Sequence, residues 1–384
     1  MINVLYINFA SENFDGAVYS LMDLIESVKV EVNPIVMLRT KGCVYDYFTQ
    51  HGVECLICDF EEDLVGIPIK WHQYIRYAIR YFPRHISYQR KNIKCISVVS
   101  ERLKCRDIKI VHINNTVMSV GFGIAKTLNA KCVWHLRGFM DLDFGWRPLR
   151  GWSRYKQDLL QSDAIIGITK SVLEHFVPLN SSNAYVISDA VRGIDDVCMI
   201  DHKDKYFLFC SAFLTKRKGC DFAVRAFAKS KLYEEGYRLK IIGKGEDRYA
   251  INLKAMVEEL GLSESVDFVG LIDNVKEYME RATAFLMCSE NEGLGRVSIE
   301  AMFYGCLVIG RNSGGTKDIL VDNETGYLFD DVDGCAKAMH KAIRDNNKKI
   351  IENAQRYACD NFSRENYGRK ILAVYDKLLN PKNV

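Results

Sequence analysis

Apolar and polar positions along the first half of the chain repeat one unit, which consists of an apolar run, a polar turn and an amphipathic helix. Residues 4–9 form an apolar run typical of a buried strand, and residues 17–28 place Leu21, Leu24 and Ile25 on one helical face. Further strands are expected at 33–38, 54–58, 108–113, 130–135, 164–168 and 184–187. Strands that alternate with helices predict an α/β fold with parallel sheets covered on both faces.

A second series of strands is expected at 206–211, 239–242, 265–269, 284–287 and 307–310. The two series meet in the polar, charged stretch 195–205, which is typical of a domain hinge. We therefore expect an N-terminal domain over 1–195, a C-terminal domain over 196–362, and a helix within 363–384 that crosses back to the N-terminal domain. Ligands of parallel sheets bind beyond the carboxyl ends of the strands, so we expect the chemistry in a cleft between the domains.

The composition of the chain fits two folded domains and disfavours some functions. Its 384 residues are too many for one ordinary core, and only 6 prolines leave little room for disordered linkers. A net charge of +3 argues against a dedicated nucleic-acid binder. Residues 1–10 lack the basic leader of a signal peptide, and no run approaches the ~18 apolar residues of a membrane span, so we expect a cytoplasmic protein.

The 13 cysteines are scattered through apolar segments, which fits a reducing compartment where thiols act as small core residues. Cys55 and Cys58 form a C-x-x-C pair, but they lie in a strand-like run without a second pair of ligands. We interpret this pair as part of the core rather than as a zinc site.

An acidic glycine loop follows the fourth strand of the second series. Gly293 and Gly295 allow backbone amides to approach an anion, and a helix that begins near Arg296 presents its positive end to a diphosphate. Glu300, about one turn into that helix, can accept hydrogen bonds from a vicinal diol such as ribose. Glu292 can do the same for sugar hydroxyls. Two isolated glutamates would be read as solvated surface residues, but the ordered series of glycine turns around this pair favours a ligand site.

From about residue 207 to residue 329, the chain resembles the donor-binding domain of the family 4 glycosyltransferases, which are retaining enzymes of the GT-B fold. The resemblance rests on Ile-Ile-Gly-Lys-Gly at 241–245, Val-Asp-Phe-Val-Gly at 266–270, the pair Glu292 and Glu300, and the Gly-Gly loop at 314–315. It implies a GT-B fold, with two Rossmann-like domains whose parallel sheets face each other across a cleft.

The resemblance also implies roles for residues of the C-terminal domain. Glu300 would bind the donor ribose, Lys218 would bind the diphosphate, and Glu292 would bind the transferred sugar. The other donor-binding residues would be Gly243, Gly293, Leu294 and Gly295, whose backbone approaches the donor, and Arg217 as a further cation.

One position departs from the family pattern. The family usually shows a Gly-Arg pair ahead of a Lys-Gly pair, and this chain has Ala212 and Phe213 in its place. A cation that would neutralise the leaving diphosphate is therefore missing from its usual position, and Lys216 or Arg217 would have to compensate. The departure puts the strength of donor binding in question rather than the fold.

Strand ends in the first half provide further candidates. Gly16 opens a helix, and the resemblance implies that its amide approaches the diphosphate or the acceptor, although a single glycine there also suits an ordinary turn. His135 resembles the family histidine near the donor sugar, which would make it a catalytic residue together with Lys218 and Glu292. Arg137 is a secondary candidate, and a purely structural role for His135 is the alternative. The Asn-Asn-Thr stretch at 114–116 would face the same cleft or form a structural turn.

The chain has an Asp-x-Asp pair at Asp141 and Asp143. In the other main glycosyltransferase fold, a pair of this kind holds a divalent cation. That fold has one nucleotide-binding domain with the pair at a strand end, whereas this pair follows His135 in a chain with two domains. We therefore expect no metal and no cofactor, with Lys218 and the helix amides supplying the electrostatic stabilisation.

Residues 70–109 combine many cations with interleaved aromatic residues. The cations are Lys70, Arg76, Arg80, Arg84, Arg90, Lys91, Lys94, Arg102, Lys104, Arg106 and Lys109. A helical segment of this kind can lie on an anionic membrane, and the resemblance places it beside the acceptor cleft, which suits a lipid-linked saccharide. The alternative is a pair of helices with a solvated basic face. Nucleic acid is not expected, because no binding motif accompanies the charge.

Together these features predict a retaining glycosyltransferase that moves a hexose-type sugar from a UDP-sugar or GDP-sugar to a saccharide or lipid-linked saccharide acceptor. We expect it to act in cell-surface polysaccharide synthesis, in the cytoplasm or peripherally at the inner face of the membrane. Two alternatives stay open. A noncatalytic nucleotide-sugar-binding subunit would bind donor without turnover, and a nucleotide-sugar epimerase would act on the donor without an acceptor.

Overall fold

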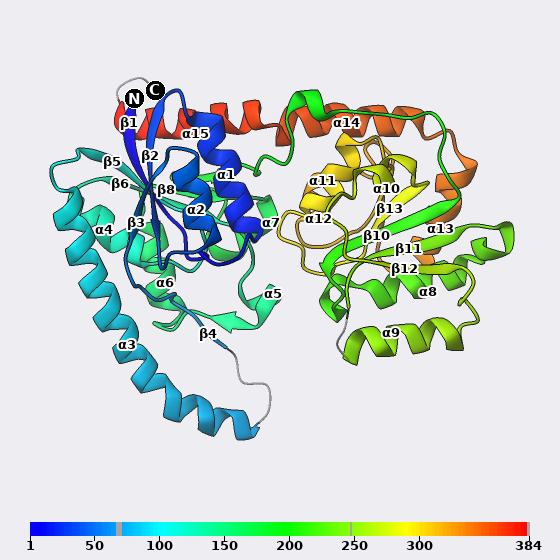
Figure 1. Ribbon diagram of the computed structural model, residues 1–384, viewed down its shortest axis with the longest axis horizontal. Helices are drawn as coiled ribbons and strands as arrows, with labels where there is room; N and C mark the ends of the chain where they lie inside the picture. The colour runs from blue at the N-terminus through cyan, green and yellow to red at the C-terminus, as the bar shows by residue number, and fades with distance from the viewer. Residues whose placement is uncertain (67–70, 246–247, 382–384) are drawn as a thin grey trace. The chain divides into compact units, whose positions relative to one another are not determined.

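The computed structural model of the protein describes residues 1–66, 71–245 and 248–381, with the side chains of 71–78 left out of the description. The chain divides into two compact units (Figure 1). Unit 1 comprises Met1–Asp189 and Tyr367–Val384, and unit 2 comprises Ala190–Asn366. The expected boundaries at 195 and 362 lie close to these divisions.

Unit 1 is built on a seven-stranded parallel sheet of order β3-β2-β1-β5-β6-β8-β9. Its strands are β1 (Ile2–Ile7), β2 (Val32–Leu38), β3 (Glu54–Ile57), β5 (Ile108–Ile113), β6 (Lys131–Leu136), β8 (Ala164–Gly167) and β9 (Ala184–Val186). Its helices are α1 (Gly16–Val28), α2 (Cys43–Gln50), α3 (Trp71–Leu103), α4 (Val120–Leu128), α5 (Asp141–Phe144), α6 (Trp152–Leu160), α7 (Lys170–Phe176) and α15 (Arg364–Leu379). The last four residues of both β1 and β2 are buried, as expected for central strands covered on both faces.

Unit 2 is built on a six-stranded parallel sheet of order β12-β11-β10-β13-β14-β15. Its strands are β10 (Tyr206–Phe213), β11 (Arg238–Lys244), β12 (Val266–Gly270), β13 (Ala284–Met287), β14 (Val308–Arg311) and β15 (Tyr327–Phe329). Its helices are α8 (Cys220–Ser230), α9 (Arg248–Glu259), α10 (Lys276–Arg281), α11 (Arg296–Phe303), α12 (Thr316–Ile319), α13 (Val332–Arg344) and α14 (Lys348–Phe362), and the short 3-10 helix η2 (Lys216–Lys218) precedes α8.

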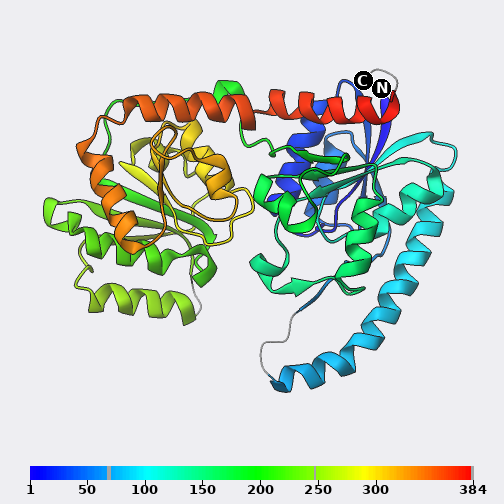
Figure 2. The ribbon, with the colours of Figure 1, turned by 180° about the vertical axis from the view of Figure 1, so that it is seen from behind.

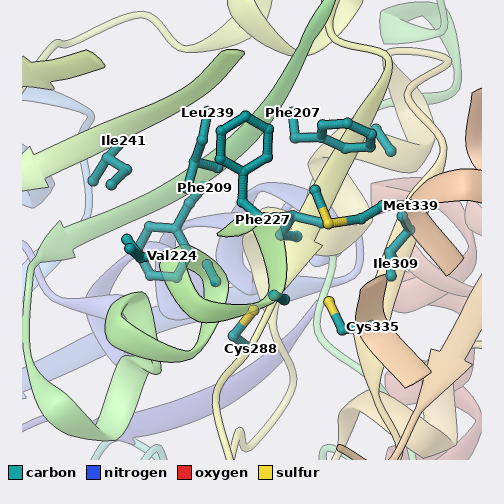
Figure 3. Packing of buried hydrophobic residues seen from close by; sticks show 14 of the residues in the cluster. Phe207, Phe209, Val224, Phe227, Leu239, Ile241, Cys288, Ile309, Cys335 and Met339 are labelled. Atoms are coloured by element: carbon teal, nitrogen blue, oxygen red, sulfur yellow. The ribbon is translucent and has the colours of Figure 1, made fainter. Parts of the chain in front are cut away.

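The core of unit 2 lies between this sheet and the helices α8 and α13. Phe207 and Phe209 of β10 belong to one cluster with Phe227 of α8 and Met339 of α13, and all four side chains are buried (Figure 3). Complete burial of such large side chains contributes about 1.5–3 kcal/mol each. The sheet is therefore a stable base for the loops that leave the carboxyl ends of its strands.

The C-terminal helix α15 packs against unit 1. Figures 1 and 2 both show α15 in red beside the blue helix α1. The contact is close, because a Cβ at Gly368 would lie 2.4 Å from the carbonyl oxygen of Ser27. Only glycine allows α15 to approach α1 at this distance.

The expected alternation of strands and helices is confirmed, with differences at particular elements. β5 and β13 have the expected residues, whereas β10 continues to Phe213 and β15 was not expected. The antiparallel pair β4 (Val65–Gly66) and β7 (Trp146–Arg147) was also not expected, because two-residue strands have no detectable period.

Two expectations about the first half are corrected. Within 70–109 the alternative of two helices is wrong, because α3 runs continuously for 33 residues with Pro83 inside it. Cys55 and Cys58 are half-buried rather than fully within the core.

In the part of the chain that is described, no helix is both long and apolar enough to cross a membrane.

Candidate functional site

Several loops of unit 2 meet closely at the carboxyl ends of its strands. We define the glycine loop as residues 288–295, between β13 and α11. A Cβ at Gly315, after β14, would lie 2.0 Å from the carbonyl oxygen of Gly293, and a Cβ at Gly219 would lie 2.4 Å from that of Cys288. A Cβ at Gly243, after β11, would lie 2.3 Å from the carbonyl oxygen of Ser211. These glycines allow the loops to pack backbone against backbone.

Gly295 brings the glycine loop into helix α11. It has a φ of 72°, in the left-handed region, and its carbonyl accepts a hydrogen bond of 2.8 Å from the amide of Ser298. The residues from Gly293 to Gly295, including the buried Leu294, therefore lead directly to the N-terminal end of α11. The exposed amides and the dipole at such an end attract an anion such as a phosphate.

Lys218 and Glu292, which the sequence analysis singled out separately, form an ion pair. The Lys218 Nζ lies 2.9 Å from Glu292 Oε2, and the Glu292 backbone oxygen accepts a 2.6 Å bond from the Gly315 amide. Glu292 is thus held by the neighbouring loop, and it holds the lysine of η2. Arg217 and Lys216 lie in the same short helix.

Glu300, in the second turn of α11, pairs with an arginine that sequence analysis did not identify. Arg192 Nη2 lies 3.0 Å from Glu300 Oε1, and Arg192 Nε donates a 2.6 Å hydrogen bond to the hydroxyl of Tyr304. Burial lowers the pKa of the Arg192 guanidinium, but the combined effect of Glu300, Tyr304 and Asp196 raises it above its usual value. Arg192 lies in the segment after β9 and has no motif around it, so only the fold brings it to Glu300.

Phe213, at the position where the resemblance leads us to expect a cation, lies at the end of β10 with 64% of its surface exposed. Its carbonyl accepts a 3.0 Å bond from the hydroxyl of Ser211. The strand therefore directs a phenyl ring to solvent near η2. The cations close to this position are the lysines and the arginine of η2 itself.

In unit 1, Gly16 is the first residue of α1, and the carboxylate of Asp15 caps this helix by accepting a 2.9 Å bond from the amide of Val18. No atom lies within 4 Å of a Cβ built at Gly16. A side chain would therefore fit at this position, and no close contact within the described structure requires a glycine there. Its predicted role at the donor stays a prediction.

His135 is fully buried in a polar network of unit 1. Its Nδ1 lies 3.2 Å from Nε2 of His112, whose Nδ1 lies 2.6 Å from the hydroxyl of Tyr375 on α15. Burial lowers the pKa of both imidazoles well below the usual value, so both rings are neutral near pH 7. A donor sugar would reach His135 only after a rearrangement of this network, and its catalytic role stays a prediction.

The same network contains a buried ion pair between Arg137 and Asp189. Asp189 also accepts hydrogen bonds from the hydroxyls of Ser20, at 2.7 Å, and Tyr367, at 3.3 Å. Asn114 accepts bonds from Arg137 and donates one of 2.9 Å to Asn8. Residues 114–116 were expected either to face the cleft or to form a structural turn, and these contacts fit the structural role. No sequence pattern marked Asp189, because its partners come from distant parts of the chain.

The acidic pair of α5 is engaged by protein groups. Asp141 Oδ1 lies 2.7 Å from Nε2 of His175, and Asp143 Oδ2 accepts a 2.8 Å bond from the amide of Phe139. Among the residues that the structure describes, no three His, Cys, Asp or Glu side chains gather in a group that could hold a metal ion.

Comparison with known proteins places these features in a family context. Residues 196–357 match the family model described as glycosyl transferases group 1. The lipopolysaccharide core biosynthesis mannosyltransferase LpcC of Rhizobium leguminosarum is 26% identical over 226 residues, which cover 57% of this chain and 63% of that protein. A relative from Campylobacter jejuni is 34% identical over 135 residues, which cover 34% of this chain and 36% of that protein. Its name is GalNAc-α-(1→4)-GalNAc-α-(1→3)-diNAcBac-PP-undecaprenol α-1,4-N-acetyl-D-galactosaminyltransferase. The chain thus spans less than two thirds of the length of these relatives.

Similarity to solved structures extends over almost the whole chain. The structure of Alr3699/HepE from Anabaena in complex with UDP superposes with a TM-score of 0.79 and 16% sequence identity, covering 98% of this chain and 100% of that one. The two units each contain a parallel sheet, as expected for two Rossmann-like domains. We conclude that the chain has the GT-B fold, and that the match of residues 196–357 to glycosyl transferases group 1 supports a glycosyltransferase.

Proposed function

We propose that the protein is a retaining glycosyltransferase of the family 4 type, which transfers a hexose from a UDP-sugar or GDP-sugar. The observation that carries the proposal is the arrangement at the carboxyl edge of the unit 2 sheet. There the glycine loop enters α11, Glu292 pairs with Lys218, and Glu300 pairs with Arg192. This edge is where open parallel sheets bind nucleotides.

In the proposed reaction, the bond between the anomeric carbon and the diphosphate oxygen breaks, and a bond from that carbon to an acceptor hydroxyl oxygen forms. Negative charge develops on the departing diphosphate. Lys218, assisted by Arg217 and by the amides of α11, stabilises this charge without a metal ion. Such preorganised donors contribute on the order of 3 kcal/mol each to the transition state.

Glu300 binds the donor ribose in this proposal, and Glu292 and the backbone of residues 293–295 bind the transferred sugar. Gly243 allows the adjoining loops to approach the donor closely, and Gly16 and His135 of unit 1 keep their predicted donor-side roles. The acceptor gives its proton to the leaving phosphate oxygen, so the anomeric configuration is retained without a nucleophilic side chain.

The proposed acceptor is a saccharide or a lipid-linked saccharide, in cell-surface polysaccharide synthesis. Two similarities support it: the Campylobacter relative is named for a PP-undecaprenol acceptor, and the Rhizobium relative for lipopolysaccharide core synthesis. Hexose donors are supported in the same way by the mannosyltransferase name of the Rhizobium relative.

We further propose that α3 brings the protein to the cytoplasmic face of an anionic membrane. Ile79, Phe82, Ile86 and Ile93 are between 48% and 70% exposed, and their spacing places them on one face of this helix. Exposed Arg80, Arg84, Arg90 and Lys94 flank them. An apolar stripe bordered by cations is typical of helices that lie in the membrane interface.

A noncatalytic nucleotide-sugar-binding subunit is the second candidate. The observation in its favour is Phe213, an exposed aromatic ring where the family resemblance places an arginine. Loss of a cation at the leaving group would lower the rate of transfer more than the affinity for donor, because charge on the diphosphate is greatest as the bond breaks.

Calorimetric titration with UDP-sugars and GDP-sugars in EDTA tests the proposal. We expect micromolar binding of one donor by the wild type, loss of that binding in Glu300→Ala, and unchanged binding in Glu259→Ala, which removes an exposed carboxylate of α9. Turnover of the bound donor with an acceptor separates the enzyme from the noncatalytic subunit. The absence of binding by every donor would refute both candidates.

A further inference from the structure

Unit 1 contains a cavity of about 320 Å³ that no step of the proposed reaction uses. Its lining residues are Phe9, Arg39, Glu61, Glu62, Arg84 and Ser87. Phe9 follows β1, Arg39 follows β2, and the two glutamates follow β3, while the remaining two residues belong to α3. The cavity therefore lies at the carboxyl edge of the unit 1 sheet, where parallel sheets bind their ligands.

Hydrogen bonds hold the glutamate-bearing wall of the cavity against α3. The Glu61 amide donates a 2.9 Å bond to Oδ1 of Asn92, and the Asn92 side-chain amide returns a 3.0 Å bond to the Glu61 carbonyl. The hydroxyl of Ser87 donates a 2.8 Å bond to the Glu61 carboxylate, which also lies 3.2 Å from Nζ of Lys91. A wall with this many fixed contacts is formed before any ligand arrives.

The opposite wall is equally defined. The Arg39 guanidinium lies 5.1 Å from the centre of the Phe9 ring, and its Nε lies 3.3 Å from the carboxylate of Asp59. Arg39 is thus held between an aromatic face and a carboxylate. Its remaining N–H groups can serve as donors for a ligand.

Glu62 is a half-buried carboxyl group in the lining of the cavity. Burial, with a further contribution from the carboxylate of Asp15, raises the pKa of Glu62 to about 7 against the opposing effect of Arg39 and Arg84. The other charged groups that line the cavity are Arg39, Arg84 and Glu61, and Glu61 forms an ion pair with Lys91. Near pH 7 the Glu62 carboxyl is therefore present in both its neutral and its charged form.

The chemistry of the lining indicates the class of ligand. Two arginine donors, two carboxylate acceptors and an aromatic ring line the cavity. Phosphate oxygens accept hydrogen bonds and so match the two arginines but not a charged carboxylate, whereas a sugar hydroxyl both donates and accepts and matches both kinds of group. The volume is at the lower end of the range for ligand sites, which suits a single monosaccharide unit rather than a nucleotide.

We propose that this cavity binds one uncharged hexose unit of the saccharide acceptor, with Glu62 accepting hydrogen bonds from its hydroxyls. The proposal rests on the proposed function and names its acceptor subsite. Phe9 of the cavity lies in the segment between β1 and α1, which ends at Gly16, the turn that was predicted to face the donor or the acceptor. The cavity thus lies beside the expected chemistry of unit 1.

Saturation-transfer NMR titrations with methyl α-D-mannopyranoside, methyl β-D-glucopyranoside and methyl α-D-galactopyranoside test the subsite, with and without UDP. We expect at least one hexoside to bind the wild type, and its affinity to rise as the pH passes upward through about 7, because a charged carboxylate accepts stronger hydrogen bonds. Glu62→Gln should weaken binding by roughly 10-fold or more and abolish the pH dependence. Arg84→Gln, a change at an exposed helix position, should also weaken binding.

The control is Glu31→Gln, which removes an exposed carboxylate outside the cavity and should leave hexoside binding unchanged. Binding of no hexoside, equal binding by Glu62→Gln, or stronger binding of inorganic phosphate than of any hexoside would overturn the proposal. UDP binding, measured by calorimetry on the same samples, distinguishes failure of the acceptor subsite from failure of the proposed function. If UDP binds and the hexosides do not, the subsite is refuted while the proposed function stands, and failure of donor binding alone refutes the function.

Discussion

Replacement of Gly315 by alanine tests whether the packing of loops in unit 2 positions the donor. The added Cβ would lie 2.0 Å from the Gly293 carbonyl oxygen and 2.9 Å from that of Glu292. Since Cβ atoms do not approach backbone oxygens this closely, the two loops must separate by about 1 Å, and the 2.6 Å bond from the Gly315 amide to Glu292 is lost or lengthened. A displacement of about 1 Å in a positioning element costs on the order of 100-fold in rate.

We therefore expect Gly315→Ala to lower kcat/KM for transfer by about 100-fold and to weaken UDP binding, although the new side chain is only a methyl group. Destabilisation by overpacking should stay at about 1–3 kcal/mol, so a folded variant can be assayed. Calorimetry gives the affinity, transfer assays give the rate, and circular dichroism confirms folding. The control is Gly193→Ala, where the nearest atom to the added Cβ is 3.6 Å away. Wild-type affinity and rate in Gly315→Ala would refute the reasoning.

Three further predictions follow from named contacts. Asp189→Asn leaves the buried Arg137 without its counter-ion and should lower the free energy of unfolding of unit 1 by about 3–5 kcal/mol. Urea denaturation followed by tryptophan fluorescence measures this, because all 4 tryptophans lie within 1–189, and a loss below about 1 kcal/mol would contradict it. Because the pKa of His135 is lowered well below its usual value in the fold, the unfolded chain binds more protons below pH ~6.5, and unit 1 should lose stability as the pH falls from there. Equal stability at pH 7 and pH 5 would exclude this. Arg192→Met should weaken UDP binding by roughly 10-fold through the loss of the partner that orients Glu300, with partial recovery in Arg192→Lys, and unchanged affinity in calorimetry would show that the pair is not needed.

Much of the fold could be predicted because buried parallel strands are continuous apolar runs. β5 and β13 were predicted to the residue, and most other strands within one or two residues at each end. β15 escaped because it has three residues and lies within the turns after α12. α3 was uncertain because an internal proline such as Pro83 is typical of a break between two helices rather than of one continuous helix.

The candidate site could be predicted only where its residues are close in sequence. The glycine loop and Glu300 lie within one strand, turn and helix, so local geometry indicates their shared role. The pairing of Glu292 with Lys218 joins two loops that are far apart in the chain, and Arg192 comes from a segment without a motif. The tertiary fold, rather than the local sequence, brings the partners in these two ion pairs together.

The sequence by itself determined the period of strands and helices and the glycine turn before α11, because each depends on interactions within about one turn or one strand. Only the tertiary structure decided that His135 is enclosed with His112 and neutral, and that Glu62 and Arg39 share a cavity. The physical reason is that burial and the approach of distant charges set the state of an ionisable group, and both arise only when segments far apart in the chain pack together.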